Sequence, residues 1–262
     1  MLAAFGYLAA ALMALEVDKL AGRLSGRGWV LTLLASLAYA AALVLLTQAW
    51  LLLAAPRRRL PLVIGLAIYG PAVIAKYLPG SVFQYVSRQA LGATRGLSQG
   101  EMARSSVVEV LLHLAAAIGV AIAMLLANSP AVPVVLFAGG LIVSLLARHA
   151  VVKAAGLQCA FFAAFAGIVL LLATAVFQVD EPVRLAALFL LAWLAGFLVP
   201  VAPGGIGVRE AALLALAVPG ESALLVALFA VTTRVVTIVG DALFGLSAYL
   251  VTALARENRQ AP

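Results

Sequence analysis

Apolar runs long enough to cross a bilayer dominate this chain and limit what it can fold into. The clearest is residues 30–55, which contain no charged side chain and end at Pro56 and the triplet Arg57-Arg58-Arg59. A membrane-spanning helix needs roughly 20 mostly apolar residues. Similar runs occupy residues 105–127, 132–147, 154–179 and 222–255, and a shorter one occupies residues 2–15. We therefore expect an all-α, polytopic membrane bundle.

The composition excludes a soluble fold. Of the 262 residues, 66% are hydrophobic and 10% are charged, whereas soluble domains carry about 25% charged residues. The net charge of +7 does not predict a nucleic-acid partner, because the basic residues lie in short links between apolar runs. The single cysteine, Cys159, allows no disulfide within the chain, and we expect it to pack as a small apolar residue. No cleavable signal peptide is evident, since no basic segment precedes the first apolar run.

The basic links assign sides to the membrane. Residues 57–59, residues 88–104, the pair Arg148 and Lys153, and the tail are basic and should be cytoplasmic. Residues 128–130, residues 180–181 and Glu221 carry no basic excess and should face outward. We expect one integral membrane domain over residues 1–255 and a polar, cytoplasmic C-terminal tail over residues 256–262.

This assignment makes two apolar segments re-entrant. Residues 60–91 begin and end on the cytoplasmic side, and residues 183–218 begin and end on the outer side. Gly70-Pro71 also interrupts the apolar run within residues 60–75. Each of the two segments carries a Pro-Gly break near its middle, and such breaks are typical of segments that turn back inside a membrane. We predict six full spans plus two re-entrant helical hairpins that enter from opposite sides.

The two breaks have similar sequences. "YLPGSVFQYVSRQAL" (residues 77–91) and "VAPGGIGVREAAL" (residues 201–213) both read Pro-Gly, an uncharged stretch, Arg with Gln or Glu, then Ala-Leu. This similarity favours an inverted repeat, whose interface commonly holds a substrate near the membrane midplane. Chance similarity between two short motifs is the alternative.

The breaks predict an anion site. A half-helix that starts after a break presents free backbone N–H groups and a partial positive charge, and arginine adds a fork of donors suited to phosphate. The alternative is a structural loop whose arginine pairs with a helix end. We expect the substrate-binding residues to be those of the two breaks together with the charged residues at membrane depth. They are Lys76, Pro79, Gly80, Arg88, Gly204, Gly205, Arg209, Glu210, Arg234 and Asp241.

Arg234 and Asp241 share one face of the last predicted helix, about 10 Å apart along its axis. Charges at a helix centre are costly in lipid, so each needs a partner or a polar cavity. Glu210 is a candidate partner for Arg234, and Lys76 or Arg209 for Asp241. We favour structural pairing over direct substrate contact.

Glu109 and His113 lie on one face of the run 105–127 and could relay protons. A core histidine is the alternative for His113. Two such residues do not define a metal site, and no P-loop pattern occurs. Ser81 lacks a GxSG element with a histidine partner, so we expect no catalytic residues, no metal and no cofactor.

The chain resembles the flippase-like, lysylphosphatidylglycerol synthase transmembrane-region family, which includes the membrane half of the bacterial multiple peptide resistance factor and stand-alone relatives. The likeness lies in "KYLPGSVFQYVSRQ" (residues 76–89), "PVAPGGIGVREAAL" (residues 200–213) and the arginine-containing last helix. It implies a multi-pass protein of the bacterial inner membrane that moves a polar-headed lipid between leaflets. Arg88 and the pair Arg209-Glu210 would be its motif residues.

The family likeness leaves several points open. The chain ends soon after its last predicted helix, so we expect no aminoacyltransferase domain and no aminoacyl-lipid synthesis by this chain. The sequence does not determine the lipid head group. It also leaves open whether the protein forms a homo-oligomer and whether it works with a partner enzyme that makes the lipid. The leading expectation is a translocase for an anionic or phosphate-bearing lipid. A small-anion or ion-coupled transporter is the alternative, and an intramembrane lipid-modifying enzyme comes after it.

Overall fold

The structure is a computed structural model that describes residues 24, 26–58, 60–78, 82–199, 205, 207–216 and 222–260, with side chains up to residue 255. The predicted first span, residues 2–15, lies outside the described residues. So do Pro79, Gly80 and Gly204 of the expected site. The helices that flank both Pro-Gly breaks in the sequence are described.

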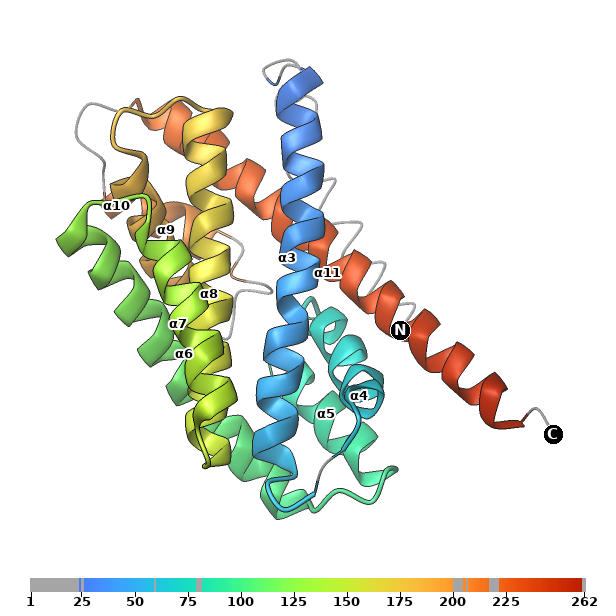
Figure 1. Ribbon diagram of the computed structural model, residues 1–262. Coiled ribbons are helices and arrows are strands. Elements are labelled where there is room, and N and C mark those ends of the chain that lie inside the picture. Colours follow the sequence, from blue (N-terminus) through green and yellow to red (C-terminus); the bar gives the residue numbers. More distant parts are fainter. Residues whose placement is uncertain are drawn as a thin grey trace.

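The described residues form α-helices and no strand (Figure 1). Within the part of the chain that the structure describes, four helices are long and apolar enough to cross a membrane: α3 (Gly26–Ala54), α6 (Gln99–Ala127), α8 (Ala150–Ala175) and the part of α11 that covers Ala223–Ala255. Three shorter apolar helices are α4 (Leu62–Ala75), α7 (Val132–Leu146) and α9 (Pro182–Leu198). The short helices α5 (Phe83–Ala93) and α10 (Val208–Leu216) follow the two breaks, and α11 as a whole spans Ala223–Gln260. The predicted all-α membrane fold is thus confirmed in its coarse form.

Local chemistry explains several helix ends. Ser98 caps α6 by accepting a hydrogen bond from the backbone N–H of Glu101, in a Ser-x-x-Glu capping pattern. The same helix ends at Asn128, whose left-handed backbone (φ 44°) is tolerated by asparagine. Pro182 is the first residue of α9, where a missing N–H costs nothing.

Two sequence-based boundaries were wrong. The apolar run of residues 60–75 is not interrupted at Gly70-Pro71, because α4 continues through Pro71 to Ala75. Gly70 instead permits close helix packing, since a Cβ built on it would lie 2.5 Å from the Cβ of Ala248 in α11. The last helix also runs to Gln260, into the stretch expected to be a polar tail from residue 256.

The helices pack in a regular pattern. α3 lies against α8, α4 against α11, and α6 against α9. α7 packs on α8 through Gly140 and Gly156, where a Cβ on Gly140 would lie 2.5 Å from the Gly156 carbonyl oxygen. α4 and α5 lie together toward one end of the bundle, and α9 and α10 toward the other (Figure 1).

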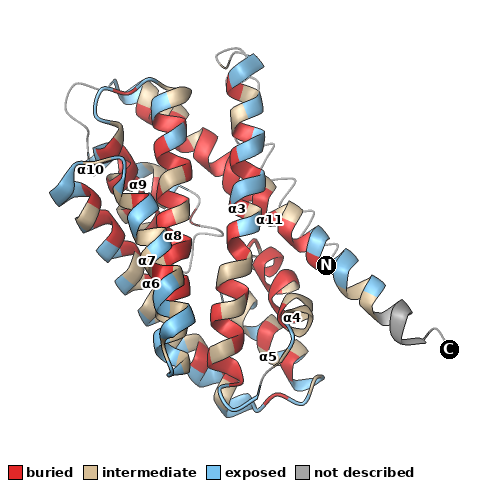
Figure 2. Ribbon diagram, in the orientation of Figure 1, coloured by how far each residue is buried: buried red, intermediate tan, exposed pale blue. Residues whose placement is uncertain are grey.

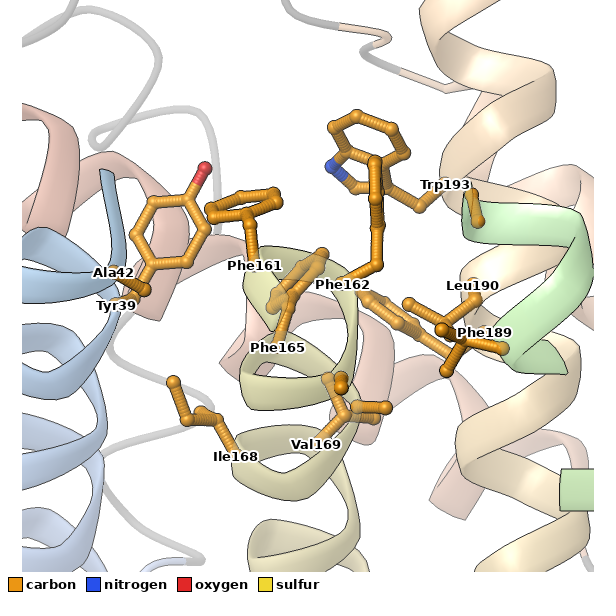
Figure 3. Close-up of a cluster of buried hydrophobic side chains, with 14 of the residues drawn as sticks. Tyr39, Ala42, Phe161, Phe162, Phe165, Ile168, Val169, Phe189, Leu190 and Trp193 are labelled. Atoms are coloured by element: carbon orange, nitrogen blue, oxygen red, sulfur yellow. The ribbon is translucent and has the colours of Figure 1, made fainter. Parts of the chain in front are cut away.

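An aromatic core joins α3, α8 and α9 (Figure 3). The rings of Tyr39 and Phe165 are 5.2 Å apart between centroids, and those of Phe162 and Trp193 are 5.3 Å apart. Edge-to-face aromatic pairs add to the energy of burial itself. Tyr39 and Trp193 of this core also line a cavity inside the bundle, which is described below. The core therefore fixes part of the wall of that cavity.

Many large apolar side chains are exposed on the outside of the bundle, and Figure 2 shows how buried and exposed residues alternate along its helices. α7, for example, leaves Val134, Val135, Leu145 and Leu146 between 65% and 78% exposed. The side chains of Arg88, Glu109, Arg209, Arg234 and Asp241 are buried instead. Apolar side chains outside and charges inside are the arrangement expected of a helical bundle surrounded by lipid.

Candidate functional site

A central cavity lies inside the bundle, with an empty volume of about 830 Å³ that includes its open part. It is the large cavity of this site, in contrast to a smaller one beside it. Its walls come from α3, α4, α5, α6, α9, α10 and α11, so residues far apart in the sequence meet there. Residues next to both Pro-Gly breaks line it. Lys76 and Tyr77 precede the first break, and Gly205 follows the second. Among the described residues, the charged, amide, imidazole and hydroxyl side chains that line it are Tyr39, Tyr69, Lys76, Tyr77, Gln84, His113, Arg209, Arg234, Thr237 and Asp241.

One side of the cavity holds an ion pair between α4 and α11. The Nζ atom of Lys76, just after α4, lies 2.7 Å from Oδ2 of Asp241. The hydroxyl of Tyr77 donates a hydrogen bond of 2.6 Å to the same oxygen. The other oxygen of Asp241, Oδ1, is buried and accepts no hydrogen bond from the described residues. Lys76 is the partner that the sequence suggested for Asp241, together with Arg209.

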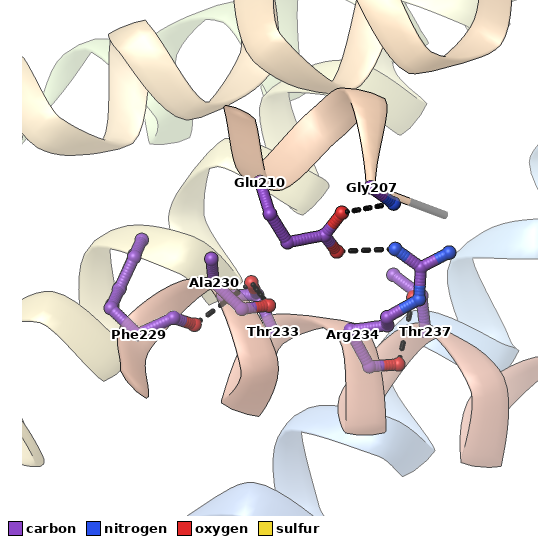
Figure 4. A network of polar contacts seen from close by, with 7 residues as sticks. All are labelled: Gly207, Glu210, Phe229, Ala230, Thr233, Arg234 and Thr237. Atoms are coloured by element: carbon purple, nitrogen blue, oxygen red, sulfur yellow. Dashed lines mark hydrogen bonds and ion pairs between the residues drawn. The ribbon is translucent and has the colours of Figure 1, made fainter. Parts of the chain in front are cut away.

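A second ion pair joins α10 to α11 (Figure 4). The guanidinium of Arg234 donates to Oε1 of Glu210. The other oxygen of Glu210 accepts a hydrogen bond of 2.8 Å from the backbone N–H of Gly207, which precedes α10. Glu210 therefore both caps the half-helix, as a glutamate in its first turn often does, and neutralises a buried arginine. This confirms the expected pairing of Arg234 with Glu210.

Arg209 lines the cavity from the first turn of α10 and is buried. Its guanidinium lies 5.7 Å from the centre of the Trp193 ring. The backbone brings it there because Gly205 passes very close to α9, and a Cβ on Gly205 would be 3.0 Å from the Cα of Gly196. Gly205 also has φ +72°, which side-chain-bearing residues rarely adopt. Among the breakpoint glycines expected in the site, Gly205 is the one the structure describes, and it lines the cavity.

Arg88 occupies a smaller, adjacent cavity of about 210 Å³. Its guanidinium donates to Oε2 of Glu109, whose Oε1 accepts a hydrogen bond of 3.0 Å from the Tyr69 hydroxyl. Three rings surround the guanidinium carbon of Arg88 at 4.9 to 5.8 Å, those of Tyr85, Tyr69 and Trp50. Such cation–π contacts hold a buried guanidinium in a fixed place.

The sequence suggested that Arg88 and Arg209 line one cavity. The structure places them in two different cavities instead. Arg209 lines the large cavity and Arg88 the small one, although both cavities share Tyr69, Gln84, His113 and Phe197 as walls. The reason is the buried carboxylate of Glu109, which holds Arg88 on its own side of this shared wall.

Glu109 and His113 lie on one face of α6 and both line the small cavity. The carboxylate of Glu109 is engaged by Arg88 and Tyr69. The ring of His113 lies among aromatic side chains, 5.1 Å from Phe162 and 5.5 Å from Phe197 between centroids. These surroundings are those expected of a core histidine, and a proton relay through Glu109 and His113 stays a prediction. Within the described part of the chain, no group of three or more His, Cys, Asp or Glu side chains could hold a metal ion.

Sequence reasoning missed two tyrosines of the site, Tyr39 and Tyr69. Both line the large cavity, and Tyr69 bonds Glu109. A tyrosine within an apolar run has no motif around it, so its role depends on which helix faces it. The aromatic residues close to the breaks were better signals, since Tyr77 and Trp193 line the large cavity and Tyr85 lines the small one.

Cations exceed anions at the large cavity. Of the described residues, three cations line it, Lys76, Arg209 and Arg234, together with one carboxylate, that of Asp241. The carboxylate of Glu210 neutralises Arg234 from the edge. A surplus of positive charge in a low-dielectric surrounding attracts anions much more strongly than it would in water. The arrangement suits a guest with one negatively charged group, and the rings of the wall suit its apolar part.

Comparisons of the chain with family models, with curated proteins and with solved structures found no match. The interpretation of the site therefore depends on its own geometry and chemistry.

Proposed function

We propose that this protein is a lipid translocase, which moves a lipid with an anionic, phosphate-bearing head group between the leaflets of a bacterial inner membrane. The observation that carries the proposal is the cavity just described. Side chains from both broken hairpins and from the last helix meet there, with a surplus of positive charge. The sequence resemblance to the flippase-like family supports the same function. In this proposal the protein carries out no covalent chemistry.

We propose further that the chain is an inverted repeat in which α3 to α6 correspond to α8 to α11. The packing supports this pairing, because each contact in one half has a counterpart in the other. α4 lies on α5 as α9 lies on α10, and α4 lies on α11 as α9 lies on α6. α3 and α8, the first helices of the two halves, pack against each other. α7 then links the halves, so that the second runs in the opposite direction through the membrane.

The buried ion pairs repeat the same relationship with exchanged charges. In the first half, α5 supplies Arg88 and the following helix α6 supplies Glu109, 21 positions later. In the second half, α10 supplies Glu210 and the following helix α11 supplies Arg234, 24 positions later. Each pair fixes a half-helix to the long helix that follows it. Such pairs would hold the two hairpins in corresponding positions on either side of the cavity.

The exposure of the half-helices supports hairpins that reach into the bilayer. α5 buries Arg88 and leaves Phe83 and Val86 42% and 55% exposed. α10 buries Arg209 and leaves Leu214 and Leu216 41% and 42% exposed. An arginine inside and apolar residues outside would be unfavourable in water but are favourable in lipid. With the first span added, this gives the six spans and two re-entrant hairpins that the sequence suggests.

In the proposed mechanism, the head group enters the cavity while its acyl chains remain in the membrane. Arg209, whose guanidinium offers a fork of donors, would bind the phosphate. Lys76 and Arg234 lie at the same cavity and are paired with Asp241 and Glu210, so a phosphate at Arg209 would bind beside these ion pairs without displacing either carboxylate. The negative charge of the phosphate would offset the positive surplus of the cavity.

The alternative is a carrier of a small soluble anion, coupled or not to an ion. The two carboxylate–cation pairs at the cavity favour it, because paired charges at membrane depth often mark ion pathways. Both functions use the same cations and differ in whether the cargo has acyl chains.

One experiment separates the two functions. Purified protein is reconstituted into liposomes for two assays. In the first, fluorescent phosphatidylglycerol is present in both leaflets; in the second, inorganic phosphate, a soluble anion, is added outside the liposomes. The proposal predicts that an external quencher reaches lipid from the inner leaflet faster than in protein-free liposomes, while phosphate does not enter. Entry of phosphate without faster lipid movement would replace the lipid proposal with the carrier alternative.

A further inference from the structure

A further cavity lies at the end of α3, away from the two cavities described above. Its empty volume is about 1100 Å³, including its open part. One wall is the end of α3 with the link to α4, and the opposite wall is the link from α7 to α8 with the first turn of α8. Among the described residues, four cations and no carboxylate line it. The cations are Arg57, Arg58, Arg148 and Lys153.

The positive-inside tendency accounts for basic residues in each link but not for their meeting in one cavity. Arg57 and Arg58 follow the second predicted span, whereas Arg148 and Lys153 lie beside a link much later in the chain. The fold brings these two groups together because α3 and α8 pack against each other. Four like charges in one hollow repel one another, so the site favours an anionic guest.

The depth of this cavity in the membrane follows from its neighbours. Leu145 and Leu146, at the end of α7, are 78% and 77% exposed, and Val151 and Val152, at the start of α8, are each 44% exposed. Arg148 lies between these two apolar pairs. The cations therefore lie at the edge of the lipid-facing apolar band, where phospholipid phosphates are found.

The walls also include apolar side chains, those of Leu51, Leu52 and Leu60. We infer that this basic cavity binds an anionic phospholipid of the surrounding leaflet, with the phosphate at the four cations and part of an acyl chain against the leucines. Basic pockets between membrane helices on the cytoplasmic side are suited to such head groups. This site is separate from the central cavity and does not require that the protein transports lipid.

The test compares lipid binding to two variants with equal charge. Purified protein is titrated with phosphatidylglycerol or with phosphatidylcholine, and bound lipid is counted by native mass spectrometry. The first variant carries Arg57→Gln, Arg148→Gln and Lys153→Gln, which removes three charges from the basic cavity. The control carries Arg27→Gln, Arg104→Gln and Arg184→Gln, which removes three exposed charges elsewhere.

We expect the native protein and the control to bind phosphatidylglycerol about tenfold or more tightly than phosphatidylcholine. The cavity variant should bind one phosphatidylglycerol fewer than the native protein and the control, because any lipid in the central cavity is retained. The single Arg148→Gln variant, which disturbs the surface least, should weaken the binding that the cavity variant loses by about fivefold. An unchanged number of bound phosphatidylglycerol molecules in the cavity variant, or an equal loss in the control, would overturn the inference.

A competition separates a lipid site from a site for a soluble phosphate. Glycerophosphoglycerol, the head group without acyl chains, should not displace phosphatidylglycerol at equal concentration, because it lacks the contact with the leucines. Equal displacement would refute the lipid assignment. A failure of the translocation experiment would leave this result unaffected, since neither variant changes a residue of the central cavity.

Discussion

The ammonium group of Lys76 lies 2.7 Å from the carboxylate of Asp241, and the two differ in burial: the side chain of Lys76 is 25% exposed and that of Asp241 is 0% exposed. The pair connects the end of α4, next to the first break, to the middle of α11. Breaking it from either side should therefore have unequal consequences.

Lys76→Met should be the more damaging of the two changes. It leaves Asp241 charged and buried without its cation, which costs about 3–5 kcal/mol for a buried pair. Asp241→Asn leaves Lys76 able to turn toward its exposed side, and Asn keeps a hydrogen bond to Tyr77, so we expect a loss of about 1–2 kcal/mol. The measurement is thermal unfolding in detergent.

The double variant completes this comparison. With both charges removed, the stability should return close to that of Asp241→Asn alone. If Lys76→Met were no less stable than Asp241→Asn, the carboxylate would not depend on this lysine.

Arg88→Lys should destabilise the protein although the charge is kept. A lysine ammonium cannot stack on the three rings around Arg88 as a planar guanidinium does, and we expect a loss of about 1–2 kcal/mol. Arg88→Gln should cost more, because it leaves the buried carboxylate of Glu109 without a cation. Thermal unfolding of the two variants gives the order, and a lysine variant as stable as the native protein would contradict it.

Gly205→Ala should reduce both stability and transport. Its Cβ would meet the backbone of Gly196, and its φ of +72° disfavours alanine, so we expect a loss of about 1–3 kcal/mol. Gly119→Ala is the matched control, since a Cβ at this exposed position of α6 would meet nothing within 4 Å. That change should be neutral or stabilising by up to about 1 kcal/mol. Equal behaviour of the two alanine variants would show that Gly205 does not pass close to Gly196 of α9.

The proposed topology can be tested with single cysteines, because the chain has one native cysteine. In a Cys159→Ala background, Arg58→Cys and Ser98→Cys should react with a membrane-impermeant thiol reagent from one side. Asp180→Cys and Ser222→Cys should react from the other side, since each pair brackets one proposed hairpin. Labelling of the two members of a pair from opposite sides would mean that the hairpin between them crosses the membrane completely.

Much of the fold could be predicted from the sequence because spanning helices need long apolar runs that are easy to recognise. Residues 30–55 and 132–147 were predicted to within a few residues of α3 and α7. Gly70-Pro71 could not be interpreted in the same way. A proline within a helix and a proline at a break look alike in sequence, and packing against Ala248 explains why glycine stands at position 70.

The site was only partly predictable. The partners of Arg234 and Asp241 could be suggested because few charges lie at membrane depth and each must be neutralised. The separation of Arg88 from Arg209 could not, because it depends on how far Glu109 on α6 reaches toward α5. Three-dimensional packing, which no short motif records, decides which side of the shared wall a long side chain occupies.

The most direct test of the account measures lipid movement by an Arg209→Gln variant in the phosphatidylglycerol liposomes described above. Glutamine keeps hydrogen-bonding groups but removes the charge that should bind the phosphate, so we expect at least a tenfold slower rate. Arg184→Gln, at an exposed arginine paired with Glu181, is the control and should move lipid at the native rate. If a correctly folded Arg209→Gln protein moved lipid as fast as the native protein, the cavity between the hairpins would not be where the head group binds.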